Sequence, residues 1–187
     1  MPLEAAKIPS DHAGRMGLWI RSGLWLSCSE GPFVTLSIRT LGYAERLILD
    51  QEQRIAAVAD NRALRTELET LLMECAAHSI LWIFGLYEVV RVVKDTNPAR
   101  FDAIKGLFEN LEILRMPLAK HQTKNAPGYR DTLHYPLGIW FDHGSVGWEV
   151  LDPHTKAVRR LTRTGIANEF LSITAATPIF HPVETAR

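Results

Sequence analysis

Residues Ser79–Val93 read SILWIFGLYEVVRVV and form the most apolar stretch of the chain. The uncharged part of this stretch ends at Tyr87, and Glu88 and Arg91 follow before the roughly 20 apolar residues that a membrane-spanning helix needs. This stretch has almost no polar face, and a helix of that kind must be covered on several sides. The stretch therefore predicts the central helix of a bundle or the contact surface of an oligomer, and no membrane span.

This stretch is the second half of a helix that the pattern predicts over about residues 62–95. Its first half is amphipathic, with leucines on one side and charged residues on the other. Asn61 is suited to cap the first turn. Asn97 followed by Pro98 is suited to end this helix and to begin the next one, because proline fits the first position of a helix.

Two further helices flank the apolar one. Apolar residues recur at helical spacing from Pro32 to Val58 and again from Phe101 to Leu114. Pro117 is expected to break or kink the later helix and to leave a short separate turn over residues 117–122, because proline has no backbone N–H. Together these segments predict a helical bundle over residues 32–125.

The two ends of the chain have different patterns. Residues 1–31 are rich in glycine and proline and predict an irregular arm, with a short strand near residues 18–27 and with Trp19 and Trp25 packed onto the main body. Residues 126–187 contain three short runs rich in Val, Ile, Trp and Phe, separated by turn sequences. They predict a three-stranded antiparallel meander over 138–142, 146–152 and 157–162. A short helix over 165–173, capped by Thr164, is expected to follow and to pack on one face of the meander.

The predicted fold class is α+β, mainly a helical bundle with the C-terminal meander and short helix in the same globular unit. The 187 residues include 21 Lys and Arg and 21 Asp and Glu, so the formal net charge is zero, and 47% are hydrophobic. This composition excludes a disordered chain and a protein that binds nucleic acid by overall charge alone. The two cysteines show no metal or disulfide spacing, which favours a reducing, cytoplasmic location.

The strongest candidate site is the segment Arg115-Met116-Pro117-Leu118-Ala119-Lys120-His121. An arginine that is always charged and a histidine that titrates near neutrality are suited to attack on a phosphodiester. His121 could take a proton from a ribose 2′-hydroxyl while Arg115 stabilises the charge on the phosphorane. Lys120 and Lys124 make the neighbourhood basic and are the expected substrate-binding residues, together with Glu88 and Arg91 from the apolar helix.

The Arg-x5-His spacing near the end of a helical bundle resembles the motif of the HEPN (higher eukaryotes and prokaryotes nucleotide-binding) superfamily. The resemblance covers about residues 32–123 and assigns only Arg115 and His121. It implies a dimeric helical protein that binds RNA or acts as a metal-independent endoribonuclease in a defence or toxin–antitoxin setting. It also implies that the arginines and histidines of the two protomers meet at the dimer interface.

Two other interpretations remain open at the level of sequence. The first is a non-enzymatic interaction module that dimerises through the apolar helix around Ser79–Val93 and engages a protein partner. The second is a small-ligand binder with a pocket between helices lined by Trp82, Tyr87 and Glu88. Arg115 and His121 can also simply cap helix ends, and Glu88 and Arg91 can form a structural ion pair. No phosphate loop, dinucleotide motif, nucleophile elbow or metal-ligand spacing occurs, so we expect neither cofactor nor metal.

Overall fold

The computed structural model describes residues 8–26, 32–120, 137–142, 144–152 and 155–176. Its helical elements follow one another along the chain as α1 (His12–Leu26), α2 (Pro32–Val58), the short 3-10 turn η1 (Arg62–Leu64), α3 (Arg65–Thr96), α4 (Pro98–Lys120) and α5 (Arg163–Ala176). The strands between α4 and α5 are β1 (Leu137–Asp142), β2 (Ser145–Leu151) and β3 (Val158–Thr162). The chain is therefore mainly helical, with antiparallel strands near its C-terminal end and a closing helix, as the sequence predicts.

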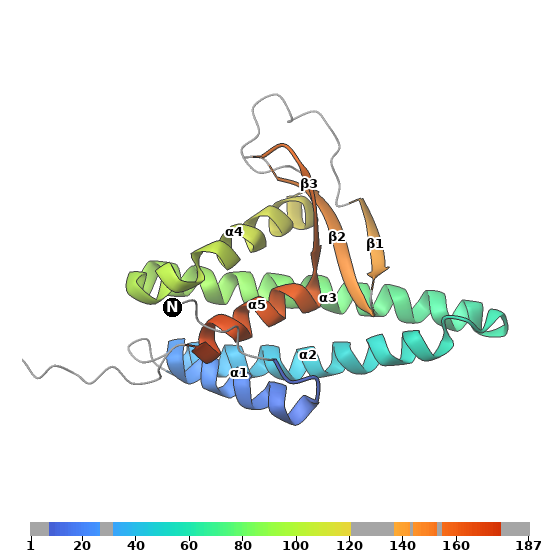
Figure 1. Cartoon of the computed structure of the whole chain (residues 1–187), viewed down its shortest axis with the longest axis horizontal. Coiled ribbons are helices and arrows are strands. Elements are labelled where there is room, and N and C mark those ends of the chain that lie inside the picture. The colour runs from blue at the N-terminus through green and yellow to red at the C-terminus, as the bar shows by residue number, and fades with distance from the viewer. Residues whose placement is uncertain (1–7, 27–31, 121–136, 143, 153–154, 177–187) are drawn as a thin grey trace, which may run out of the picture.

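Helices α2 and α3 form a long pair of neighbours at the centre of the molecule (Figure 1). Helix α1 packs along α2, and α4 packs along α3. Helix α5 contacts both α1 and α4, so it bridges the two outer helices on one face of the bundle. The strands lie at one end of α5 and contact α4, α5 and α3 through β2.

The ends of α3 follow the capping residues that the sequence indicates. The side-chain oxygen of Asn61 accepts a hydrogen bond from the backbone N–H of Ala63 at 3.1 Å, which starts the 3-10 turn that leads into α3. The side-chain oxygen of Asn97 accepts from the N–H of Arg100 at 3.3 Å, and α4 begins at Pro98. The caps satisfy N–H groups that have no partner inside the helix, which explains the helix boundaries.

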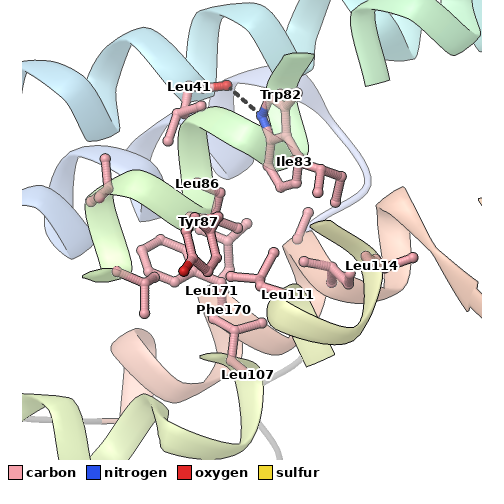
Figure 2. Close-up of a cluster of buried hydrophobic side chains, with 14 of the residues drawn as sticks. Leu41, Trp82, Ile83, Leu86, Tyr87, Leu107, Leu111, Leu114, Phe170 and Leu171 are labelled. Atoms are coloured by element: carbon pink, nitrogen blue, oxygen red, sulfur yellow. Dashed lines mark hydrogen bonds between the residues drawn. The ribbon is translucent and has the colours of Figure 1, made fainter. Parts of the chain in front are cut away.

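The core is built around large side chains of α3. Figure 2 shows side chains of α3, α4 and α5 gathered in one cluster, with the indole of Trp82 donating a hydrogen bond to the backbone carbonyl of Leu41 at 3.0 Å. The ring of Trp19 packs edge-on to Trp82 at 5.8 Å between centroids and stacks on Phe170 at 5.1 Å. Trp19 therefore links α1, α3 and α5, and Trp25 is also buried, as predicted for this pair of tryptophans.

The prediction of an irregular N-terminal arm with a strand is wrong for residues 12–26, which form helix α1. Glycine disfavours a helix in isolation, but Gly23 of α1 and Gly42 of α2 allow these two helices to pack closely. A Cβ at Gly23 would lie 3.4 Å from the backbone of Thr35 in α2. A Cβ at Gly42 in α2 would lie 2.8 Å from the Trp19 side chain. Tertiary packing of α1 against α2 therefore outweighs the low helix propensity of the segment.

Two predicted details near helix ends are also wrong. Helix α4 continues through Pro117 to Lys120 instead of breaking there. Only the backbone hydrogen bond that Pro117 itself would donate is lost, and the remaining turn is short. The N-terminus of α5 is capped by Thr162 and not by Thr164: the Thr162 hydroxyl accepts from the N–H of Gly165 at 2.9 Å.

The strands pair in the order β1-β2-β3, and both pairs are antiparallel. Gly147 lies opposite Trp140 in β1 and opposite Thr162 in β3, and the register of β1 shifts between Leu137 and Trp140. Val146, Trp148 and Val150 on β2 are all buried. The buried face of β2 therefore packs on the helical core, and β3 leads directly into α5.

Candidate functional site

Arg115 lies near the C-terminal end of α4, where it meets side chains of α3. Its guanidinium carbon is 4.6 Å from the centroid of the Tyr87 ring, a cation–π contact. One of its terminal nitrogens is 4.0 Å from Oε1 of Glu88, and 29% of the Arg115 side chain is exposed. The guanidinium is therefore held in place from one side and is open to solvent on another.

Glu88 also forms the ion pair with Arg91 that the sequence predicts. The Nε of Arg91 donates to Oε2 of Glu88 at 2.8 Å, and a terminal nitrogen of Arg91 is 3.5 Å from the Asp95 carboxylate. The Glu88 carboxylate raises the pKa of Arg91 above its ordinary value. The side chains of Glu88 and Arg91 are each about half exposed, so this pair lies on the surface and not inside the buried segment.

The structure brings three of the predicted site residues together: Arg115, Glu88 and Arg91, referred to below as the Arg115 cluster. Lys120 is the last residue of α4, and its side chain lies outside the described part of the chain. His121 and Lys124 also lie outside the described residues. The cluster shows that an arginine at the end of α4 and an acidic–basic pair of α3 share one solvent-accessible site.

An apolar groove lies beside the Arg115 cluster, between α2 and α3. It has a volume of about 490 Å³, and Glu88 is the charged residue in its lining. From α2 it is lined by Phe33, Val34, Leu36, Ser37, Thr40 and Leu41, and from α3 by Gly85, Glu88, Val89 and Val92. Leu41 approaches Gly85 closely, because a Cβ at that glycine would lie 2.9 Å from the leucine side chain. The groove and the cluster therefore share Glu88 as a common edge.

The three residues of the predicted ligand pocket, Trp82, Tyr87 and Glu88, do not share the groove between α2 and α3. Trp82 and Tyr87 are buried members of the core, and of the three residues only Glu88 lines the groove. The Trp82 indole donates a hydrogen bond to the backbone of α2, and the Tyr87 ring stacks on Phe108 at 5.5 Å between centroids. Both rings therefore make structural contacts within the core. An apolar helix thus turns its aromatic residues toward the core rather than toward a ligand.

A second group of charges, which the sequence reading misses, is buried in the middle of the molecule. Glu45 and Glu52 of α2, Arg15 of α1 and Arg163 of α5 have almost no exposed surface. Arg163 donates to Glu45 at 3.0 Å and to Glu52 at 2.6 Å. Arg15 binds Glu45 with two nitrogens, at 3.2 and 2.5 Å. The four side chains, called the buried network below, balance one another in charge.

Neutral partners complete the buried network. The Trp19 indole donates to Glu45 at 2.6 Å, and the backbone N–H of Val146 donates to Glu52 at 3.4 Å. A terminal nitrogen of Arg15 donates to the side-chain oxygen of Asn168 at 2.8 Å. The network therefore ties α1, α2, α5 and the sheet together, and its pairing offsets the cost of removing four charges from water.

One sequence signal could have revealed this network. Glu45 and Glu52 are seven residues apart and fall on the same helical stripe as Leu41, Ile48 and Ile55. Carboxylates on a core-facing stripe require buried cationic partners. The positions of those partners, in segments more than 25 residues away on either side, depend on tertiary structure and leave no local pattern.

Cys75 of α3 is buried next to the network. Burial, together with a smaller effect of the nearby Glu52 charge, raises the pKa of the Cys75 thiol to about 11, while the charge of Arg163 acts in the opposite direction. A thiol of this kind stays protonated at neutral pH and is a poor nucleophile. Cys75 therefore behaves as a small core residue, as the sequence predicts.

Comparisons with known proteins do not assign this site to a family. No family model, no curated protein and no solved structure matches the chain.

Within the described residues, no three His, Cys, Asp or Glu side chains form a group that could hold a metal ion. Among the described helices, α3 is long and apolar enough to cross a membrane, a test that the core helix of a soluble protein also passes.

Proposed function

We propose that the chain is an RNA-binding protein of the HEPN-like type that cleaves RNA without a metal ion, at a site built on Arg115 and His121. The observation that carries the proposal is the placement of Arg115. Its guanidinium is fixed by Tyr87 and Glu88 yet remains partly open to solvent. Arginine in such a position can form paired hydrogen bonds with a phosphate group.

The chemistry follows from the two side chains. The imidazole of His121 takes a proton from a ribose 2′-hydroxyl, and the 2′-oxygen then attacks the adjacent phosphorus. The bond from phosphorus to the 5′-oxygen breaks, the protonated imidazole of His121 gives its proton to that oxygen, and a 2′,3′-cyclic phosphate remains. Arg115 stabilises the extra negative charge of the phosphorane while the bonds exchange. No residue outside this pair is needed for the proton transfer.

The other predicted residues have supporting roles in this proposal. Glu88 orients Arg115 from a distance of 4.0 Å, and Arg91 adds a second guanidinium within the same cluster. Lys120 and Lys124 follow Arg115 in the sequence and supply positive charge for the RNA backbone. Because the net charge of the whole chain is zero, we expect contact with a few phosphates only and a modest dependence of affinity on salt.

The proposal is tested with a mixed RNA pool in the presence of EDTA. We expect cleavage by the wild type and loss of cleavage in Arg115→Ala and His121→Ala. Arg65→Ala is a matched control, because Arg65 is an exposed arginine that begins α3, at the opposite end of that helix from Glu88. Absence of cleavage in the wild type, or equal cleavage in all four proteins, would contradict the proposal.

A second candidate function is an interaction module, and a separate observation favours it. Seven of the ten strongly exposed large apolar side chains in the described residues lie on α2 and α3: Phe33, Leu36, Tyr43, Leu47, Met73, Leu81 and Val92. Soluble monomers seldom keep so many apolar side chains on one pair of helices. The two candidates separate readily, because an interaction module would leave RNA intact.

A further inference from the structure

Helix α2 is apolar on two opposite sides. One stripe, which includes Ile38, Ile48 and Ile55, faces the core. A second stripe on the other side of the helix contains Phe33, Leu36, Tyr43 and Leu47, with Thr40 between them, at the spacing of three and four residues that aligns side chains along a helix. Phe33 is 78% exposed and Leu47 is 63% exposed. A surface helix normally carries polar residues at these positions.

Helix α3 adds a parallel stripe to the same face. Leu81, Gly85, Glu88 and Val92 recur at spacings of four, three and four residues, and Leu81 is 65% exposed. The groove is lined by residues 33–41 of α2 and 85–92 of α3, so the two stripes form one surface along this part of the helices. Most of the apolar residues of Ser79–Val93 are buried, so a surface on that helix alone is too narrow and α2 provides the larger share.

The charges at the edges of this face favour a second copy of the chain as its occupant. Arg39 and Arg46 are exposed and lie on the side of the α2 stripe away from the groove. Glu88 lies at the edge of the groove on α3. Arg39 is about level with Glu88 along the helices, because Leu41 touches Gly85 and its carbonyl binds Trp82. A two-fold axis along the groove would place α2 of each copy over α3 of the other and bring these opposite charges together.

The size of the face fits this arrangement. The 27 residues of α2 span about 40 Å, of which the apolar stripe from Phe33 to Leu47 covers about 21 Å, and two packed helices present a face about 20 Å wide. The whole face therefore provides roughly the 800 Å² per partner that a standard specific interface buries, with the apolar stripe as its centre and the polar residues of α2 beyond Leu47 as its rim. The zero net charge of the chain removes the overall repulsion between two copies.

We propose that the chain forms a two-fold dimer through the α2–α3 face, with Leu36 and Leu47 of each copy buried and Arg39 of one copy paired with Glu88 of the other. The proposed interface shares Glu88 with the Arg115 cluster but does not rest on RNA chemistry. Because Glu88 also contacts Arg115, the pairing brings a basic residue of the second copy to the edge of the Arg115 cluster.

The first test is sedimentation velocity of the full chain over about 0.1 to 100 µM. We expect a dimer that dissociates on dilution, and a dissociation constant at least about tenfold higher in the double variant Leu36→Glu/Leu47→Glu. Both residues are exposed in the single chain, so the variant is expected to keep its circular dichroism spectrum. Val158→Glu is the matched control, because Val158 is an equally exposed apolar residue on β3 that lies away from the face.

The second test addresses the charge pair. We expect Arg39→Glu and Glu88→Arg each to weaken the dimer and the double variant to restore it, because only the charge-reversed pair is attractive again. A monomeric wild type, or a dimer that Leu36→Glu/Leu47→Glu leaves unchanged, overturns the proposal. If the double charge variant dimerises as weakly as the single variants do, the proposed packing of α2 of one copy over α3 of the other is wrong. A monomer that instead sediments with phosphatidylcholine and phosphatidylglycerol vesicles assigns the face to a membrane surface and overturns the proposal as well.

Discussion

The molecule contains two clusters of arginine and glutamate that have similar composition and opposite environments. In the buried network, Arg163 and Glu45 have at most 1% of their side chains exposed. In the Arg115 cluster, Glu88 and Arg91 are about half exposed. The same pairs of charged groups therefore meet in two very different dielectric environments.

This difference separates structural charges from charges available to a ligand. In the buried network each carboxylate accepts hydrogen bonds from at least two donors and has almost no exposed surface. In the Arg115 cluster the ion pairs are long or solvent-exposed, so water or a phosphate can replace one partner at little cost. Burial lets the first cluster hold α1, α2 and α5 together, and exposure leaves the second cluster accessible to a ligand.

The largest expected effect comes from removing the central cation of the buried network. Arg163→Met leaves Glu45 and Glu52 without their shared partner, and we expect a loss of about 3 to 5 kcal/mol in the free energy of unfolding by urea. Arg160→Met is the control, because Arg160 is a neighbouring arginine with an exposed ion pair to Glu149. Its expected loss is below about 1 kcal/mol. Equal urea midpoints for the two variants would contradict the expected difference in stability between the buried and the exposed charge pair.

A smaller effect tests how well the buried network is shielded from water. The pKa of Cys75 in the fold is about 11, against an ordinary value of 9.0. Between these two pH values the unfolded chain releases the thiol proton and the folded chain keeps it, so unfolding is favoured as the pH rises. We expect the free energy of unfolding of the wild type to fall relative to Cys75→Ala by up to about 3 kcal/mol between pH 8 and 11.

Measuring both proteins at each pH isolates the thiol, because tyrosines and lysines that titrate in this range are common to both. A stability difference between wild type and Cys75→Ala that stays constant with pH would contradict the account. It would show that the ionised thiol is solvated, and hence that water reaches Glu52 and Arg163.

The smallest effect is expected in the exposed cluster. Glu88→Gln removes the carboxylate of a half-exposed ion pair, and surface pairs contribute little to stability. We expect the melting temperature to change by less than about 3 °C in differential scanning calorimetry. A decrease as large as that of Arg163→Met would place Glu88 among the structural charges and weaken its assignment to a recognition site.

Helices α2, α3 and α4 and the strands are predictable from the sequence because their signals are local. Helical spacing, the caps Asn61 and Asn97, and the turn sequences between strands each depend on a few neighbouring residues. Helix α1 is missed because Gly23 of α1 and Gly42 of α2 serve the close contact between the two helices, which local preference does not report. Pro117 is misjudged for a similar reason, since a helix near its end tolerates the loss of one hydrogen bond.

The candidate site is predictable only in part. The sequence identifies Arg115, Glu88 and Arg91 as chemically suited residues, and their convergence requires the packing of α4 against α3. The exposed stripe of α2 escapes detection because Phe33 and Leu47 belong to the same apolar pattern as the core residues. Periodicity gives the direction of a side chain around its helix, and only the neighbouring helices decide whether that direction is buried.

The most direct test of the central claim is the affinity of Arg115→Gln for a fluorescent single-stranded RNA, measured by anisotropy alongside the melting temperature. The claim is that the exposed Arg115 cluster carries the function while the buried network maintains the fold. It predicts an affinity at least about tenfold below that of the wild type at an unchanged melting temperature. An affinity equal to that of the wild type would contradict it.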